Sequence, residues 1–169
     1  DSICAIIKAC QNDGLISATR TDDIANLWKA RKALSPLLRE IAPKKINEDV
    51  VVPVNTLPQF LDNVTQLSTH YKINNVNFGH AGNGNIHVNL LINPDDPDEV
   101  SRAACCLDEI FNLVIKLRGT LSGEHGIGSE KRAFITKEID FATLDLMKGI
   151  KKVFDPANIL NPGKLFPQN

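Results

Sequence analysis

Three of the four histidines of this chain lie in or beside two glycine-rich segments. The segment NFGHAGNGNIHVN contains His80 and His87, and the segment GTLSGEHGIG contains Glu124 and His125. Imidazole nitrogens and carboxylate oxygens bind divalent metals and transfer protons. Glycine lets the backbone take positive φ and approach a ligand closely, so we expect chemistry at these two loops.

The first segment predicts a hairpin with two histidines on one face. If AGNG forms the loop and His80 faces Asn85, then His87 lies on the same face as Asn85 and diagonally across from His80. Diagonal neighbours have Cβ atoms about 7–8 Å apart, a spacing at which two imidazoles can hold one ion. The alternative is that each histidine hydrogen-bonds the backbone of a tight turn. Two histidines on one face favour the metal site.

The second segment supplies a carboxylate that can complete such a site. With Glu124 the set becomes two histidines and one carboxylate, which leaves coordination positions open, as catalytic metals require. In a glycine turn both Glu124 and His125 can face one cavity, and His125 is then free to act as a base. A solvated Glu-His turn explains the spacing equally well. A metal-dependent hydrolase and a non-catalytic binding module therefore stay open as alternatives.

Two further polar residues lie at positions where a ligand is one explanation. The helix expected over about 22–40 places Arg31 on an apolar stripe. A buried guanidinium needs an anionic partner, either a structural carboxylate, which the spacing favours, or the carboxylate of a substrate. Asn89 lies two residues beyond His87 and so on the same strand face, where it contacts a ligand or fills a gap in the hydrogen bonding.

The apolar periodicity predicts an α+β fold. Helices are expected over 2–12, about 22–40, 56–71, about 98–118, near 130–138 and near 140–153, and strands over 15–20, 48–54, 74–78 and 85–92. Hairpin-length connections between these elements indicate an antiparallel sheet covered by helices, a ferredoxin-like cap, followed by a C-terminal helical segment.

Composition restricts the class of protein. The chain has 169 residues, of which 43% are hydrophobic and 23% charged, and this composition suits one globular domain. Its net charge of -1 does not indicate the basic surface that binds nucleic acid. No apolar run approaches the roughly 20 residues that span a bilayer. The cysteines are expected as buried, reduced thiols in a reducing compartment: Cys4, Cys10, Cys105 and Cys106. The chain starts with Asp in a helix-like stretch, so we expect a fragment or a processed product.

Five separated segments resemble the C-terminal half of the FAD-linked oxidases, the family of the glycolate oxidase GlcD-type subunit, D-lactate dehydrogenase and D-2-hydroxyglutarate dehydrogenase. They follow one another in the family's order and are LWKARK, EDVVVPV, FGHAGNGNIHVN, SGEHGIG and FDPANILNPGKLF. In that family a separate N-terminal domain holds the flavin pyrophosphate. The resemblance implies that residues 1–169 are the C-terminal substrate and catalytic portion, without the FAD-binding domain.

The resemblance also implies roles for single residues. The divalent metal, usually zinc in the family, is held by His80, His87 and Glu124. His125 is the base, Arg31 pairs with the substrate carboxylate, Asn89 helps to hold the substrate, and Asn161 lies against the flavin.

Two positions depart from the family pattern. Asn83 stands where many relatives have Asp, in the loop that orients a ligand histidine. The family's substrate lysine before EDVVVPV has no certain counterpart, because Lys44 and Lys45 are offset and Asn47 occupies the nearest position.

The activity implied by the resemblance is oxidation of a small D-2-hydroxy acid, such as glycolate, D-lactate or D-2-hydroxyglutarate, to the 2-oxo acid, with hydride transfer to FAD. Its partners are the missing FAD-binding half or subunit and an electron acceptor that the sequence does not identify. We expect this portion alone to be inactive, and a homodimer is compatible with the sequence. The expected location is the cytoplasm, with the mitochondrial matrix or the inner face of a membrane as alternatives.

Overall fold

The structure, a computed structural model, describes residues 24–167. The chain divides into two compact units, and the boundary falls after Leu37. Of the first unit the structure describes residues 24–37, which form most of α2 (Ile24–Ile41). The helix expected over 2–12 and the strand expected over 15–20 lie outside the described residues.

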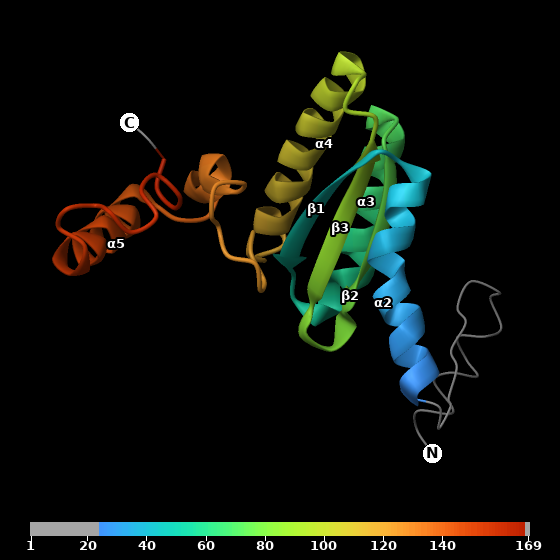
Figure 1. Ribbon diagram of the computed structural model, residues 1–169, viewed down its shortest axis with the longest axis horizontal. Helices are drawn as coiled ribbons and strands as arrows, with labels where there is room; N and C mark the ends of the chain where they lie inside the picture. The colour runs from blue at the N-terminus through green and yellow to red at the C-terminus, as the bar shows by residue number, and fades with distance from the viewer. Residues whose placement is uncertain (1–23, 168–169) are drawn as a thin grey trace. The chain divides into compact units, whose positions relative to one another are not determined.

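The second unit contains an antiparallel sheet with helices on one face (Figure 1). Its strands are β1 (Lys44–Val51), β2 (Asn74–His80) and β3 (Asn85–Ile92), and β3 lies in the middle of the order β1-β3-β2. Two helices cover one face of this sheet, α3 (Leu57–Tyr71) and α4 (Pro97–Lys116). The described residues thus confirm the α+β prediction.

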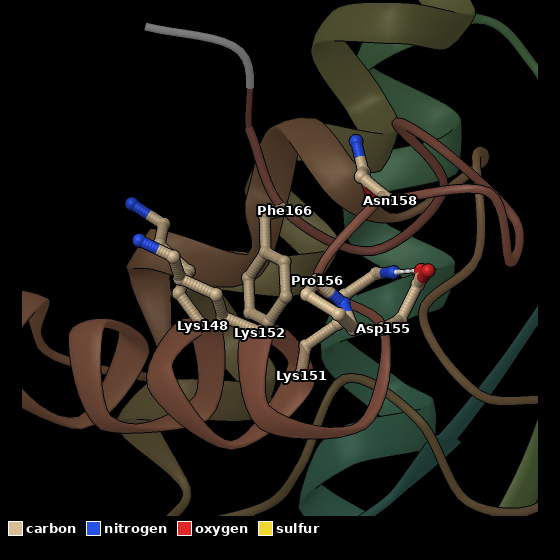
Figure 2. Close-up of a pocket in the computed structure, with 7 residues that line it drawn as sticks. All are labelled: Lys148, Lys151, Lys152, Asp155, Pro156, Asn158 and Phe166. Carbon is tan, nitrogen blue, oxygen red and sulfur yellow. Dashed lines mark hydrogen bonds and ion pairs between the residues drawn. The ribbon is translucent and has the colours of Figure 1, made fainter.

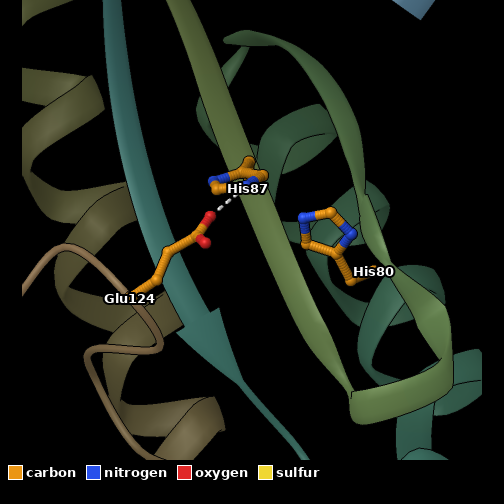
Figure 3. Close-up of side chains that lie close together, drawn as sticks. All are labelled: His80, His87 and Glu124. Atoms are coloured by element: carbon orange, nitrogen blue, oxygen red, sulfur yellow. Dashed lines mark ion pairs between the residues drawn. The ribbon is translucent and has the colours of Figure 1, made fainter. Parts of the chain in front are cut away.

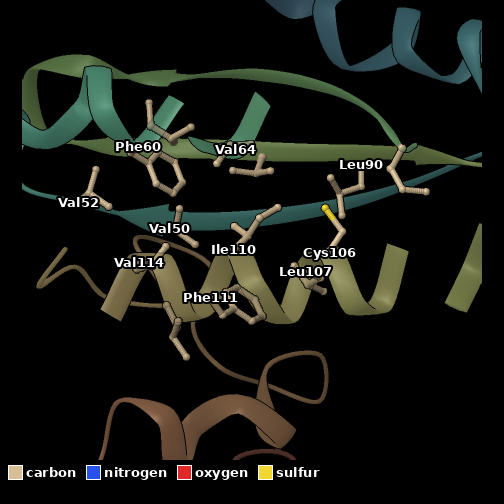
Figure 4. Packing of buried hydrophobic residues seen from close by; sticks show 14 of the residues in the cluster. Val50, Val52, Phe60, Val64, Leu90, Cys106, Leu107, Ile110, Phe111 and Val114 are labelled. Atoms are coloured by element: carbon tan, nitrogen blue, oxygen red, sulfur yellow. The ribbon is translucent and has the colours of Figure 1, made fainter. Parts of the chain in front are cut away.

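The hydrophobic core lies between the sheet and these two helices (Figure 4). Successive side chains of a strand point to opposite faces, so alternate residues of β1 and β3 meet the helices. The fully buried members of the core with the largest side chains include Phe60, Leu90, Ile92, Ile110 and Phe111. At the start of α4 the carboxylate of Asp96 accepts hydrogen bonds from the first free amides of the helix.

The opposite face of the sheet is polar, and the register brings its residues together. His80 pairs with Asn85 across the β2–β3 hairpin, as the sequence predicts. His87, on the middle strand, lies between Phe78 of β2 and Asp49 of β1. Because the side-chain period of a strand is two, His87 shares this face with Asn85 and Asn89.

Several element boundaries differ from the predictions. β1 begins at Lys44, because its pairing with β3 extends to Ile92, and it ends before Pro53, which has no N–H to donate. The segment near 130–138 forms a 3-10 helix, η3 (Arg132–Lys137), and α5 (Phe141–Phe154) follows it. α4 ends at Lys116, two residues earlier than expected.

The prediction of buried cysteines is correct for Cys106 and wrong for Cys105, and Cys4 and Cys10 lie outside the described residues. Both thiols are free, and Cys106 is buried in the core whereas Cys105 is exposed. Neighbouring positions of a helix point about 100° apart, and this rotation places the side chain of Cys105 on the exposed side of α4. Within the described part of the chain, no helix has the length and apolar character needed to cross a membrane.

Candidate metal centre

Three side chains with metal-ligating atoms meet on the polar face of the sheet (Figure 3). One ligand atom from each of His80, His87 and Glu124 lies within 4.8 Å of the other two. The imidazoles come from the facing strands β2 and β3, and their ring centroids are 6.3 Å apart. Glu124 enters from the segment that follows α4, and its Oε1 lies 3.0 Å from Nε2 of His87. The structure therefore brings together the three residues that the sequence predicts.

One member of the cluster is buried, and the other two are exposed. His87 is buried, whereas His80 and Glu124 are exposed. Burial lowers the pKa of His87, and although the charges of Asp49 and Glu124 oppose this, the pKa stays below its usual value. A lowered pKa keeps the imidazole neutral at pH 7, which is the protonation state that binds metals.

His125 lies beside the cluster. Its ring stacks on that of His87, with the centroids 5.4 Å apart and the planes inclined by 30°. Glu124 and His125 are neighbours in the chain, yet both reach the His87 side of the sheet, which the glycine turn allows. Glu124 contacts His87 directly, so the segment is more than a solvated Glu-His turn.

Asp49, which the sequence prediction missed, holds this segment against the sheet. Its Oδ2 accepts hydrogen bonds from three consecutive amides, those of Gly123, Glu124 and His125, at 2.9, 2.7 and 2.9 Å. Burial by itself raises the pKa of Asp49, but the amides of His125 and Glu124 and the charge of Lys131 lower it below its usual value. The carboxylate is therefore ionised at neutral pH.

The close approach of the segment requires a glycine at position 123. A Cβ atom there would lie 2.7 Å from Oδ1 of Asp49 and 2.9 Å from Oδ1 of Asn85. Any side chain would thus push the segment away from the sheet. The sequence signal for this contact is an acidic residue at the start of the otherwise apolar strand EDVVVPV, since a buried carboxylate needs donors.

Lys131 is a second buried charge that the sequence prediction missed. Its Nζ donates to the carbonyl oxygens of Asp49 and Leu121, at 2.6 and 2.7 Å, and lies 3.6 Å from Oε2 of Glu48. Burial lowers the pKa of Lys131, and the charges of Glu48 and Asp49 oppose it. Burial likewise raises the pKa of Glu48 above its usual value, although the charge of Lys131 acts in the opposite direction. The two groups compensate each other's burial.

Asn89 lies on the cluster face and is fully buried. Its Nδ2 donates to the carbonyl oxygens of Val76 and His87, at 2.9 and 3.1 Å. Its buried Oδ1 has no hydrogen-bond partner among the described residues, and the same holds for Oδ1 of Asn47 and of Asn85. These three acceptors lie on the face that carries His87, where a donor group of a ligand can satisfy them.

Arg31 belongs to the first unit. Its side chain is exposed, and its guanidinium carbon lies 5.8 Å from the ring centroid of Trp28. The burial expected from the apolar stripe is therefore wrong, because Trp28 and Leu34 on that stripe are themselves exposed. Its pairing with a substrate carboxylate stays a prediction.

Asn83 and Asn161 both occupy turns. Oδ1 of Asn83 accepts the amide of Asn85 at 3.2 Å and so braces the hairpin that carries the two histidines. Asn161 has a φ of 49° and lies in the tail after α5, where its carbonyl accepts the amide of Lys164. Its contact with flavin stays a prediction.

A pocket of about 360 Å³ lies between α5 and the tail, where Phe166 stands over the lysines of the helix (Figure 2). Its lining includes Lys148, Lys151, Lys152 and Asp155. No ligand of the candidate metal centre lines it, so the two features are separate.

Comparison with known proteins identifies the family. The sequence model of the FAD linked oxidases, C-terminal domain, matches residues 2–165. The chain therefore belongs to this family.

The chain is 33% identical over 169 residues to glycolate oxidase subunit GlcD of Bacillus subtilis, covering 100% of this chain and 36% of the relative. It is 37% identical over 159 residues to D-2-hydroxyglutarate dehydrogenase of Stutzerimonas stutzeri, covering 91% of this chain and 33% of the relative. It is 35% identical over 143 residues to a probable mitochondrial D-lactate dehydrogenase of Danio rerio, covering 83% of this chain and 29% of the relative. The chain thus spans about a third of the length of these relatives.

Proposed function

We propose that this chain is the substrate- and metal-binding part of an FAD-dependent enzyme that oxidises a D-2-hydroxy acid to the 2-oxo acid. The observation that carries the proposal is the cluster of His80, His87 and Glu124. It occurs in a member of the FAD-linked oxidase family whose relatives are named for glycolate, D-lactate and D-2-hydroxyglutarate. The flavin is held mainly by a portion that this chain does not include.

The donor set fits a divalent metal, and zinc in particular. Ligands about 2.0–2.2 Å from a tetrahedral zinc lie roughly 3.3–3.6 Å from one another. The donor atoms here are within 4.8 Å, and the exposed side chains of His80 and Glu124 can rotate to close the difference. Three protein ligands leave one position for a substrate oxygen. When bound, such a metal supplies Lewis-acid polarisation of that oxygen.

The remaining groups handle the proton and orient the substrate. The reaction removes a proton from the hydroxyl group and a hydride from Cα, and a bound flavin accepts the hydride. His125, exposed and stacked on His87, takes the hydroxyl proton as the general base. The family resemblance further gives Asn89, on the face that carries His87, a part in holding the substrate, and Arg31 the pairing with its carboxylate.

The experiment that tests this function uses the enzyme assembled from this chain and its flavin-binding portion. Glycolate, D-lactate and D-2-hydroxyglutarate are mixed with it without oxygen, and flavin absorbance reports reduction. We expect at least one acid to reduce the flavin, and His125→Ala to abolish reduction with flavin and metal content unchanged. His70→Ala, on the exposed surface of α3, is the matched control and keeps wild-type rates.

Two results would contradict parts of this function. Normal reduction by the His125→Ala variant would remove the base assignment. Ester or amide hydrolysis by the chain without flavin would identify a metal-dependent hydrolase, whereas a chain with neither metal nor hydroxy-acid affinity would be a binding module.

A further inference from the structure

The segment 120–131, which carries Glu124 and His125, is tied to β1 at both ends and in the middle. At its start Thr120 pairs with Val51 through two backbone hydrogen bonds, at 3.0 and 2.9 Å. In its middle the three amides around Glu124 converge on Oδ2 of Asp49. At its end lies Lys131, whose side chain returns to the sheet. The segment is therefore a closed loop fixed to one strand.

Lys131 closes this loop at its base. Its ammonium group has three protons to donate. Two go to the carbonyl oxygens of Leu121, at the loop's start, and Asp49, on β1, and Glu48 Oε2 lies on the remaining side at 3.6 Å. Lys131 is only 3% exposed, so water cannot readily replace these bonds if the side chain is removed.

The contacts form a short path from Lys131 to the candidate metal ligand. Lys131 holds the main chain of Asp49, and the carboxylate of Asp49 holds the amide of Glu124. The main-chain position of Glu124 sets where its carboxylate meets His87, at 3.0 Å. The path does not pass through the imidazole ligands, which come from the hairpin.

We propose that Lys131 is a positioning residue of the metal centre: it fixes the loop that presents Glu124 and touches no ligand atom itself. The proposal rests on the proposed metal site. It predicts that removal of the lysine side chain weakens metal binding through Glu124, although His80 and His87 stay in place.

The test measures Co²⁺ affinity and the Co²⁺ visible spectrum on the full 169-residue chain. We expect Lys131→Met to weaken binding by about 10- to 100-fold, the usual cost of losing a residue that orients a ligand. Its spectrum should shift toward that of Glu124→Ala, because both lose the carboxylate ligand. Lys137→Met is the matched control, since Lys137 lies in η3 and binds Asp108 and Asn112 rather than the loop. It should keep the wild-type affinity and spectrum.

A double-mutant cycle separates positioning from general destabilisation. If Lys131 acts through Glu124, Lys131→Met added to Glu124→Ala should cost no more than about twofold in further affinity. Losses that multiply in the double variant would overturn the proposal. Lys131→Gln, which keeps two donors, replaces the methionine variant if circular dichroism shows the latter to be unfolded.

Two other outcomes distinguish a failure of this proposal from a failure of the proposed metal site. Wild-type affinity and spectrum in Lys131→Met, while His80→Ala with His87→Ala abolishes binding, would overturn the positioning role alone. A wild-type chain that binds no Co²⁺ would overturn the metal site and the positioning role together.

Discussion

His87 combines burial, a neutral ring and a carboxylate neighbour, three properties of a metal ligand. Burial on the middle strand keeps its pKa low, so the ring offers a lone pair at neutral pH. Glu124 Oε1 lies 3.0 Å from Nε2, and this contact needs a shared proton or a shared cation. A metal bound at Nε2 needs the neutral ring, with its one proton on Nδ1, so we expect binding to weaken in acid, where protonation of the ring competes with the metal.

Glu124→Gln tests the carboxylate ligand. An amide oxygen is uncharged and binds zinc poorly, so the loss of Zn²⁺ affinity should exceed the roughly 10- to 100-fold that loss of an orienting residue costs. Isothermal titration calorimetry of the 169-residue chain measures it. Glu130→Gln, an exposed carboxylate six residues further along, is the matched control and keeps the affinity. Equal affinities for the two variants would remove Glu124 from the ligand set.

The residues of the cluster could be predicted from sequence, whereas those that support it could not. His80 and His87 belong to one hairpin, so local spacing and the period of two place them on one face. The contacts of Asp49 with Glu124 and of Lys131 with Asp49 join positions 75 and 82 residues apart. Periodicity says nothing about which distant loop reaches a strand, so both residues were missed; Glu124 was named because of its residue type in a glycine-rich turn and the family resemblance.

At the scale of elements, helix and strand positions followed from periodicity, and their ends did not. The expected helix over 56–71 corresponds to α3 and the expected strand over 85–92 to β3, both strongly patterned segments. The early start of β1 depends on its pairing with β3, and the 3-10 form of η3 has no signal in the apolar pattern. The polar face of β3 is buried as well, so burial alone would not have separated its two faces.

The end of α5 depends on one carboxylate. Asp155 accepts the amides of Ile159 and Leu160, at 2.9 and 3.0 Å, and pairs with Lys151. The hydrogen bond from Lys151 is the largest cause that lowers the pKa of Asp155, and although burial opposes it, the two amides lower the pKa further. Such a carboxylate is ionised in the folded state down to a lower pH than in the unfolded chain.

The tail that follows α5 should therefore loosen in acid. The contribution of Asp155 is fully present above the ordinary carboxyl pKa of about 3.9, and it is lost as the pH falls through the lowered folded value. Amide chemical shifts of Ile159 and Leu160 measure this transition. In Asp155→Asn they should report a loosened tail already at neutral pH, with no acid transition. Asp145→Asn, which removes an exposed ion pair with Lys148, is the control. An unchanged tail in Asp155→Asn would contradict the role of this carboxylate.

At the scale of the whole molecule, α5 exposes a stripe of large apolar side chains. The members of the stripe are between 61% and 81% exposed and recur at helical spacing: Leu146, Ile150, Val153 and Phe154. Exposed apolar patches of this kind mark contact surfaces. If the proposed function holds, the flavin-binding portion is the expected occupant of this surface.

Charges placed on the stripe should break that contact. Ile150→Asp with Val153→Asp is expected to abolish co-purification of this chain with its flavin-binding portion and to leave metal binding intact. Val54→Asp, which charges an exposed apolar residue outside α5, is the matched control. Retained co-purification of the double variant would place the contact elsewhere, and a change from dimer to monomer in light scattering would identify the stripe as a homodimer surface.

The most direct test of the metal centre is elemental analysis of the purified 169-residue chain beside its His80→Ala, His87→Ala double variant. His70→Ala serves as the control, because it removes a histidine that lies outside the cluster. We predict close to one equivalent of zinc in the wild-type chain and in His70→Ala, and none in the double variant. Equal zinc in all three, or none in the wild type after zinc is supplied, would contradict a metal centre at His80, His87 and Glu124.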